Sequence, residues 1–211
     1  MRLLLATRNT KKLVELRRIL AASPLLVDVE LVGLDDVQAY PEAPETGLTF
    51  AENALMKARE GVKYTGLATV ADDSGLSVDA LNGMPGVLSA RWSGRFGEVA
   101  EQGKDRANLD LVLDQVRDVP DAKLGAAFVC AAALVLPGGT RSDSREHLVS
   151  GTMRGQLLRA PRGDGGFGYD PIFLADGQTR SNAELTPEAK DAISHRGKAF
   201  RALAAVVAKV F

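Results

Sequence analysis

The sequence has little that would direct it to an oxidising compartment or into a membrane. Only one of its 211 residues is a cysteine, Cys130, which cannot form an internal disulfide, so a reducing cytoplasmic location fits. The longest apolar stretch, residues 126–136, falls well short of the ~20 residues that a membrane-spanning helix requires. The apolar run at residues 1–6 is too short for a signal peptide. These absences predict a cytoplasmic protein without a membrane segment.

An excess of charge of one sign is also absent. The 26 basic and 27 acidic residues give a net charge of -1, which argues against a general nucleic-acid-binding or anionic membrane-binding surface. Any binding of anions must therefore be local. The phosphate-binding pattern G-x-x-x-x-G-K-[ST] does not occur, which argues against a P-loop nucleoside triphosphatase.

The pattern of apolar residues predicts an α/β protein. At 45% hydrophobic residues the chain can build one sizeable core or two closely joined lobes. The sequence contains no repeat or linker that would divide it, so residues 1–211 are expected to form a single domain. Mixing crossover helices with a long hairpin indicates a mixed, partly antiparallel sheet. Strands are expected over residues 2–7, 27–34, 67–71, 76–81, 124–136, 140–149, 152–158 and 172–174, and helices over 10–22, 50–62, 105–116 and 194–210, with a short helix from Thr186.

The first candidate functional segment is residues 71–75. A short apolar run ends there in Asp72, Asp73, Ser74 and Gly75. Burying two adjacent carboxylates at the tip of a buried strand is costly unless cations compensate them. The alternative is an ordinary turn, because Asp, Ser and Gly are common turn formers. The stretch is expected to form a turn that presents its acids to a positive charge.

The turn between the first strand and the first helix is a candidate phosphate site. Free N–H groups and the positive end of the helix dipole attract anions. Thr7 and Asn9 can form hydrogen bonds with phosphate oxygens, and Lys12 can add charge. A capped helix with solvated lysines remains the alternative.

Three carboxylates form a candidate magnesium site. Magnesium prefers oxygen ligands and usually takes one or two carboxylates together with substrate phosphates. Glu45, Asp72 and Asp73 could supply them, and one of the three could activate water. Glu52 is better explained by a capping box with Thr49 at the start of a helix.

Two further segments could recognise a base. In Phe167-Gly168-Tyr169-Asp170 an aromatic ring could stack on a base while the backbone or Asp170 reads its edge, although a hydrophobic latch over a loop is the alternative. Near the last helix stand Lys190, His195 and Arg196. A histidine and an arginine at a helix N-terminus face the unfavourable end of the dipole, so an anionic or hydrogen-bonding group should offset them. Arg196 could instead be a solvated charge.

Taken together, these segments resemble the non-canonical purine nucleoside triphosphate pyrophosphatases, the inosine triphosphate or dITP/XTP pyrophosphatases. The resemblance runs nearly end to end, and it rests on the order and spacing of its motifs. They are Ala6-Thr7-Arg8-Asn9-x-x-Lys12, Glu45-Thr46-Gly47-x-Thr49-Phe50-x-Glu52-Asn53-Ala54, Ala71-Asp72-Asp73-Ser74-Gly75-Leu76, Phe167-Gly168-Tyr169-Asp170-Pro171 and Ser194-His195-Arg196-Gly197.

The resemblance implies roles for individual residues. Asp73 matches the catalytic acid and metal ligand of the family, and Glu45 a second metal-linked carboxylate. The residues implied in substrate binding are Thr7, Asn9, Lys12 and Lys57 for the triphosphate, Ser74 as a further contact, and Phe167, Gly168, Tyr169, Asp170, Lys190, His195 and Arg196 for the base.

The resemblance also implies the activity and the architecture. ITP, dITP and XTP would be hydrolysed to the nucleoside monophosphate and pyrophosphate with Mg²⁺ bound. The fold would be an elongated mixed β-sheet flanked by helices, with two lobes around a central substrate cleft, in a homodimer. Two other functions stay open: a non-catalytic nucleotide sensor, and a phosphotransferase that passes phosphate to a second substrate.

Overall fold

A computed structural model describes residues 2–26, 29–42, 44–138 and 146–211. Its strands form one six-stranded sheet in the order β2-β1-β3-β4-β5-β6. The strands are β1 (Arg2–Leu5), β2 (Glu30–Val32), β3 (Ala68–Val78), β4 (Gly125–Val135), β5 (Glu146–Leu157) and β6 (Phe173–Ala175). The helices are α1 (Thr10–Ala21), α2 (Phe50–Thr65), α3 (Gly94–Glu98), α4 (Lys104–Gln115), α5 (Pro187–Ile193) and α6 (His195–Val210).

The sheet is mixed, as the sequence predicted. Strand β1 pairs in parallel with both β2 and β3, whereas β5 and β6 are antiparallel. The α/β fold with helices flanking a mixed sheet is therefore confirmed.

The chain divides into two compact units that interleave along the sequence. The first unit contains Met1–Asp73, Cys130–Gly151 and His195–Phe211, and the second contains Ser74–Val129 and Thr152–Ser194. Because the chain passes repeatedly from one unit to the other, its sequence shows no linker. The organisation of residues 1–211 as a single domain stays a prediction.

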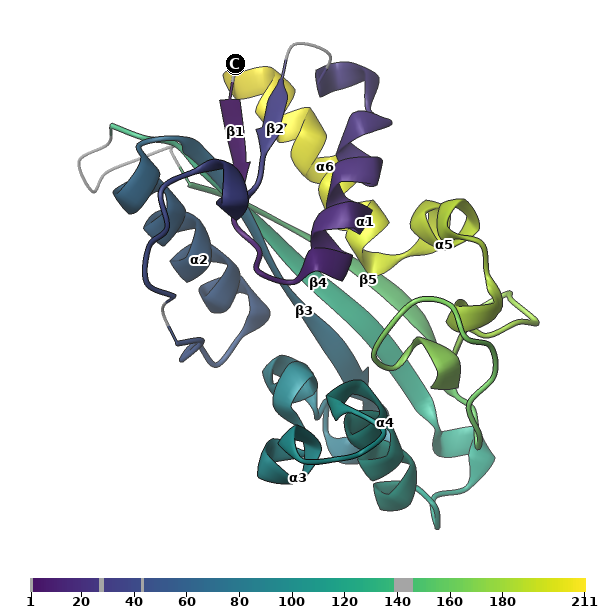
Figure 1. The fold of residues 1–211 in the computed structure, drawn as a ribbon. Helices are drawn as coiled ribbons and strands as arrows, with labels where there is room; N and C mark the ends of the chain where they lie inside the picture. Colours follow the sequence, from purple (N-terminus) through teal and green to yellow (C-terminus); the bar gives the residue numbers. More distant parts are fainter. Residues whose placement is uncertain (1, 27–28, 43, 139–145) are drawn as a thin grey trace. The chain divides into compact units, whose positions relative to one another are not determined.

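In the first unit, helices cover both faces of the strands. Neighbouring residues of a strand point to opposite faces, and Val70 belongs to the core formed with α1 and α6, while Ala71 belongs to the core formed with α2. Figure 1 shows α1 and α6 lying side by side next to β1. The first of these cores is built on Leu3 and Leu5 of β1, Leu16 and Leu20 of α1, and Phe200 and Leu203 of α6.

The second unit has a core of its own. Leu109 and Val112 of α4 pack with Leu76 and Val78 of β3. The rings of Phe128 and Phe173 complete this core, with their centroids 4.7 Å apart. The buried apolar area of each unit thus holds its own part of the long strands in place.

The turn predicted at residues 71–75 is wrong. Strand β3 runs without a break through Asp72, Asp73 and Gly75. The strand continues because each carboxylate is met by a cation or an amide from a neighbouring helix, so no turn is needed to bring it to water. Gly75 also lets the strand approach the segment 86–89 closely, since a Cβ on Gly75 would lie 2.6 Å from the Gly86 carbonyl oxygen.

Several other predicted elements are confirmed. The capping box of Thr49 and Glu52 opens α2, and Thr186 caps α5 with Pro187 in the first turn. From Glu146 onward, the two strands predicted up to residues 149 and 158 form the single strand β5, which neighbours β4 in the sheet. The turn of the predicted hairpin falls at residues 137–139, of which residue 139 lies outside the described residues, as do residues 140–145 of the strand predicted after it.

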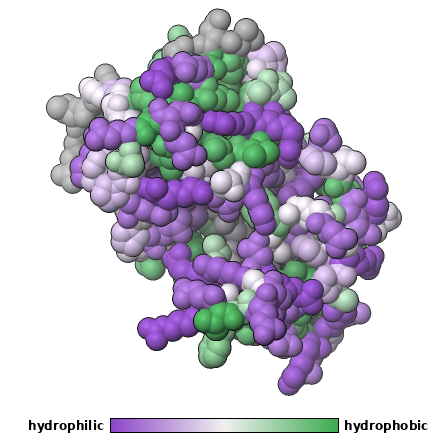
Figure 2. Space-filling view, viewed as in Figure 1, coloured by the Kyte–Doolittle hydropathy of each residue, from purple (hydrophilic) through white to green (hydrophobic). Residues whose placement is uncertain are grey.

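Two surface properties bear on binding partners. Within the ranges that the structure describes, no helix combines the length and the apolar character needed to cross a membrane. In the second unit Phe96 of α3 is 84% exposed and Val99 is 82% exposed, and Figure 2 shows hydrophobic surface at the place of α3 amid hydrophilic surface. Two such side chains do not by themselves identify a partner.

Candidate active site

The turn between β1 and α1 forms the N-terminus of a helix, as predicted. Asn9 is the N-cap: its Oδ1 accepts a hydrogen bond from the Lys12 N–H at 3.2 Å. The Asn9 N–H in turn donates to Thr7 Oγ1 at 3.3 Å. The turn is therefore a capped helix start, and it retains the positive end of the helix dipole that favours phosphate.

Asp72 lies at the centre of a row of alternating charges in the first unit. Its Oδ2 is 3.0 Å from Lys12 Nζ and 3.7 Å from Arg196 Nε. Arg196 Nη1 donates to Glu15 Oε2 at 2.9 Å. Burial alone would raise the pKa of Asp72, but the positive charges of Lys12, Arg196 and Lys57 outweigh it and hold that pKa far below the usual range. Asp72 is therefore a permanent anion.

The same row of charges includes a basic residue at the start of the last helix. His195 and Arg196 stand in the first turn of α6, and both are buried. The anionic offset expected for Arg196 comes from Glu15 and Asp72. Arg196 is thus a buried, paired cation rather than a solvated charge.

Asp73 has different partners. Asn53 Nδ2 donates to Asp73 Oδ2 at 3.0 Å, and Lys57 Nζ donates to Asp73 Oδ1 at 3.3 Å. Burial raises the pKa of Asp73, and Glu45 adds to the rise, while Lys57 and Asn53 act against it. A carboxylate that is held in place and has a raised pKa is suited to accept a proton from water.

Glu45 and Asp73 both pair with the ammonium group of Lys57. Its ammonium lies 2.9 Å from Glu45 Oε1 and 3.3 Å from Asp73 Oδ1. Burial lowers the pKa of Lys57, but the attraction of Asp73, Asp72 and Glu45 outweighs this and the pKa is raised, so the ammonium stays charged.

The donor set of this group fits a magnesium ion that also binds substrate. Among the described residues no cluster of three or more His, Cys, Asp or Glu side chains could enclose a metal ion. Magnesium, however, commonly takes only one or two carboxylates and fills its other positions with water and phosphate oxygens. Glu45 and Asp73 converge on a single positive charge, as such a site requires.

Sequence reasoning missed two residues of this site. Glu15 stands three residues after Lys12 in α1, and Asn53 stands four residues before Lys57 in α2. Residues at these spacings share a helix face, so their positions relative to the two predicted lysines could have revealed them. Asn53 also ties down the loop before α2, because its Oδ1 accepts from the Gly47 N–H at 2.8 Å.

The second unit gathers most of the residues predicted to contact the base. Asp170 Oδ2 accepts from Lys190 Nζ at 2.7 Å and from the Phe167 N–H at 2.9 Å. The Lys190 ammonium lies 5.2 Å from the centroid of the Phe167 ring. Gly168 provides the left-handed backbone of the segment, with φ of 61°. These residues therefore form one connected group.

Tyr169 has a structural position within that segment. It is buried in the core of the second unit, and its hydroxyl donates to the Ser89 carbonyl at 2.8 Å. Burial raises the pKa of this hydroxyl. Of the two aromatic residues Phe167 is the more exposed, so it is the better candidate for stacking. Ser74 follows Asp73 in β3 and is partly buried.

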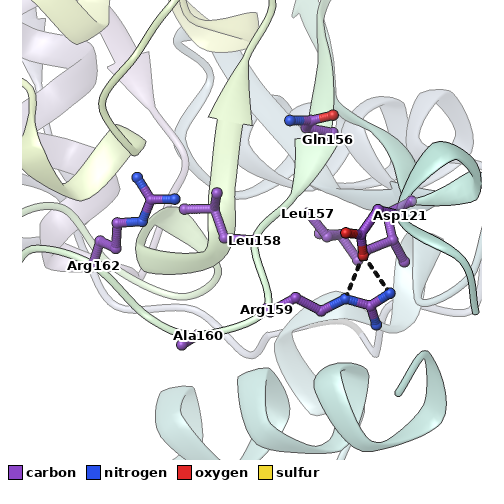
Figure 3. Close-up of a pocket in the computed structure, with 8 residues that line it drawn as sticks. Asp121, Gln156, Leu157, Leu158, Arg159, Ala160 and Arg162 are labelled. Carbon is purple, nitrogen blue, oxygen red and sulfur yellow. Dashed lines mark hydrogen bonds and ion pairs between the residues drawn. The ribbon is translucent and has the colours of Figure 1, made fainter. Parts of the chain in front are cut away.

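A separate cavity of about 340 Å³ in the second unit contains none of these residues. Figure 3 shows Arg159 on its wall, bound to Asp121. The guanidinium also donates to the carbonyl oxygens of Val116 and Arg117, just beyond the end of α4, at 3.1 and 3.2 Å. Arg159 therefore caps a helix, and the cavity is not the candidate active site.

The whole chain resembles known proteins. The sequence profile described as the Ham1 family matches residues 3–206. A dITP/XTP pyrophosphatase of Nocardia farcinica is 60% identical over 202 residues, which cover 96% of this chain and 92% of that protein. One of Frankia alni is 60% identical over 210 residues, covering 100% and 98%.

Solved structures of other proteins are also similar to this chain. The crystal structure of a nucleoside-triphosphatase / dITP/XTP pyrophosphatase from Mycobacterium abscessus matches with a TM-score of 0.74 and 58% identity, over 96% of this chain and 98% of that one. A HAM1 protein from Coxiella burnetii matches with a TM-score of 0.83 and 37% identity, over 99% of both chains.

Proposed function

Because this chain belongs to the Ham1 family, we propose that it hydrolyses dITP, XTP and ITP to the nucleoside monophosphate and pyrophosphate, and so removes them from the nucleotide pool. The observation that carries the proposal is the pair of neighbouring acids in β3. The negative charge of Asp72 is balanced by Lys12 and Arg196. Asp73 accepts hydrogen bonds from Asn53 and Lys57, and its pKa is raised. A buried acid of this second kind is suited to general-base catalysis.

The triphosphate is assigned to the first unit. The N–H groups at the start of α1 favour an anion, and Thr7 and Asn9 stand at that helix end. Lys12 and Lys57 supply positive charge, and the ammonium group of each forms an ion pair with a carboxylate. Phosphate oxygens would share these ammonium groups with the carboxylates.

Glu45 and Asp73 would hold the magnesium ion. When bound there, Mg²⁺ would neutralise charge that develops on the phosphate oxygens. Asp73 orients or deprotonates the attacking water, so water rather than a protein group is the nucleophile. Asn53 keeps the Asp73 carboxylate in one orientation through its 3.0 Å hydrogen bond. Lys57 pairs with both carboxylates and opposes the rise in the pKa of Asp73.

Base recognition is assigned to two groups of residues. The family resemblance assigns base contacts to Phe167, Gly168, Tyr169, Asp170 and Lys190 and to His195 and Arg196, with Ser74 as a further contact. Arg196 can donate to a keto oxygen at position six of the purine. Adenine presents a donor there, which would leave both sides unpaired, and a polar site converts such a loss into strong discrimination.

Other properties follow from the family resemblance alone. We propose a cytoplasmic homodimer that acts on small-molecule nucleotides and binds neither nucleic acid nor membranes. The near balance of acidic and basic residues supports the second part of this proposal.

A magnesium-dependent substrate panel tests the function. ITP, XTP, dITP, ATP, GTP and dTTP are compared, with pyrophosphate and orthophosphate measured separately. Pyrophosphate release from ITP, XTP and dITP at rates well above ATP is expected. Orthophosphate as the first product would contradict the cleavage site, and equal rates on ATP and ITP would contradict the purine discrimination.

The same panel separates the two alternative functions. A nucleotide sensor would bind the triphosphate without releasing pyrophosphate. A phosphotransferase would form a product only when an acceptor is added. The arrangement of Glu45, Asp73 and Lys57 argues for hydrolysis, because a sensor has no need of a base with a raised pKa.

A further inference from the structure

A short turn in the second unit, Ser181–Glu184, supports the glycine-rich segment 161–170. The turn has its own capping box, in which the Glu184 carboxylate accepts from the Ser181 N–H at 2.7 Å. Three hydrogen bonds join the turn to the segment: Ser181 Oγ to the Arg162 carbonyl at 2.7 Å, the Gly165 N–H to the Ala183 carbonyl at 3.0 Å, and Asn182 Nδ2 to Asp170 Oδ1 at 3.3 Å.

Two glycines of the segment, Gly163 and Gly165, are explained by this contact. A Cβ on Gly165 would lie 2.7 Å from the Ala183 carbonyl oxygen, and one on Gly163 would lie 2.7 Å from the Ala183 carbonyl carbon. A side chain at either position would push the segment away from the turn. Gly163 and Gly165 therefore allow close packing of the segment on residues 181–184.

Asn182 is the buried side chain of this contact. It is only 1% exposed. Because a carbonyl oxygen facing a carboxylate would be repelled, the Nδ2 of the amide and not its Oδ1 must face Asp170. Oδ1 accepts no hydrogen bond from any residue that the structure describes. An unpaired buried acceptor destabilises a protein, so an apolar side chain would suit stability better here.

The single hydrogen bond that Asn182 makes has consequences beyond the turn. Asp170, which is 3% exposed, receives three donors: Asn182 Nδ2, the Phe167 N–H and Lys190 Nζ. Asn182 holds one oxygen of the carboxylate, and the backbone and the ammonium share the other. Rotation of the carboxylate would therefore disturb the Phe167 backbone and the Lys190 ammonium together.

We propose that Asn182 is a positioning residue for purine recognition, whose amide fixes the Asp170 carboxylate and through it Phe167 and Lys190. This rests on the proposed function, in which Phe167, Asp170 and Lys190 contact the base. Asn182 itself does not touch the substrate. The buried amide lowers the stability of the protein but keeps the base-binding residues in one arrangement.

The test compares Asn182→Ala and Asn182→Asp with the wild-type enzyme. Kinetic constants for ITP are measured, together with inhibition by inosine monophosphate, which reports on base binding, and by tripolyphosphate, which reports on phosphate binding. For N182A we expect the KM for ITP and the inhibition constant of inosine monophosphate to rise about threefold to tenfold, because only part of the contribution of one hydrogen bond to a carboxylate is passed on to base binding. The kcat and the inhibition constant of tripolyphosphate should stay unchanged.

The second variant and a control sharpen the result. N182D keeps the shape but places a carboxylate against Asp170, so its effect should exceed that of N182A. Asn108→Ala is the matched control, because Asn108 is also a buried asparagine of the second unit, and it accepts from the Ser93 N–H and hydroxyl. N108A should lower the melting temperature without changing the ratio of the two inhibition constants.

Each contrary outcome has one meaning. If the wild-type enzyme hydrolyses none of the triphosphates, the proposed function fails. If it does hydrolyse them but N182A and N182D bind inosine monophosphate like the wild type, the role of Asn182 fails alone. An equal rise in both inhibition constants would also overturn it, since it would show a general structural role. Asn182→Leu, which keeps the branch at Cγ but carries no polar atoms, replaces N182A if the smaller variant does not fold.

Discussion

Asp72 and Asp73 are neighbours in β3, yet their carboxylates bind different ammonium groups: Asp72 lies 3.0 Å from Lys12 Nζ and Asp73 lies 3.3 Å from Lys57 Nζ. Successive side chains of a strand point to opposite faces, so one acid meets α1 and α6 and the other meets α2. The pKa of Asp72 is lowered by its cations, whereas burial raises that of Asp73. Two adjacent residues of the same type thus acquire two separate tasks.

The first prediction concerns Asp73. Asp73→Asn removes the base but keeps an oxygen that can accept from Asn53 Nδ2, so the fold should persist. Turnover of ITP should fall by about 10²- to 10⁴-fold, the usual contribution of a general base. Pyrophosphate release and the melting temperature measure the two effects. Near-normal turnover would rule out Asp73 as the catalytic base.

The second prediction concerns the pH dependence of turnover. Lys57→Met removes the strongest influence that opposes the burial of Asp73, so the pKa of Asp73 should rise further. Because the ionised form is the active one, the acidic limb of the kcat profile should move to higher pH. Lys63→Met, on the same helix but exposed, is the control and should leave the profile in place. A K57M profile that coincides with the wild type would contradict this role.

The third prediction compares a buried ion pair with an exposed one. Glu15→Ala leaves Arg196 buried without its closest carboxylate, and breaking a buried pair in this way costs about 3–5 kcal/mol. Glu146→Ala breaks the exposed pair with Arg59, which should cost less than about 1 kcal/mol. Urea unfolding of both variants measures the difference. Equal losses would show that the Glu15–Arg196 pair is not effectively buried.

The fourth prediction concerns the approach of α6 to β5. A Cβ on Gly151 would lie 2.6 Å from the Ala199 nitrogen and would also collide with the His195 carbonyl. Gly151→Ala should therefore displace the start of α6 and destabilise the protein by about 1–3 kcal/mol, the usual cost of overpacking. The KM for ITP should rise as well, since His195 and Arg196 would shift. A variant with wild-type stability and KM would show that the helix yields without consequence.

Features set by neighbouring residues could be predicted from the sequence. The capping box of Thr49 and Glu52 and the Thr186 cap of α5 were both found where expected, because a helix cap depends on residues two or three positions apart. The mixed α/β fold was also predictable, since the apolar periods of strands and helices are written along the chain. The residues assigned to phosphates and base followed from the order of the motifs, and their roles stay predictions.

Features set by distant residues could not be predicted. The acids of β3 were expected in a turn because their compensation was not visible: Lys12 is 60 residues from Asp72 in the sequence. Glu15 went unnoticed because its partner Arg196 is 181 residues away. The burial of Tyr169 could not be foreseen either, because its hydroxyl donates to the carbonyl of Ser89, 80 residues earlier; its role as a base contact stays a prediction.

By itself, therefore, the sequence determined the kinds of elements in this protein, their caps and the acidic, basic and aromatic residues available for chemistry, because these depend on short-range periodicity and hydrogen bonding. Only the tertiary structure decided which cation meets which acid. This pairing gives Asp72 and Asp73 different partners and sets the charge state of each. Electrostatic and hydrogen-bonding partners act over a few ångströms, whatever their separation along the chain.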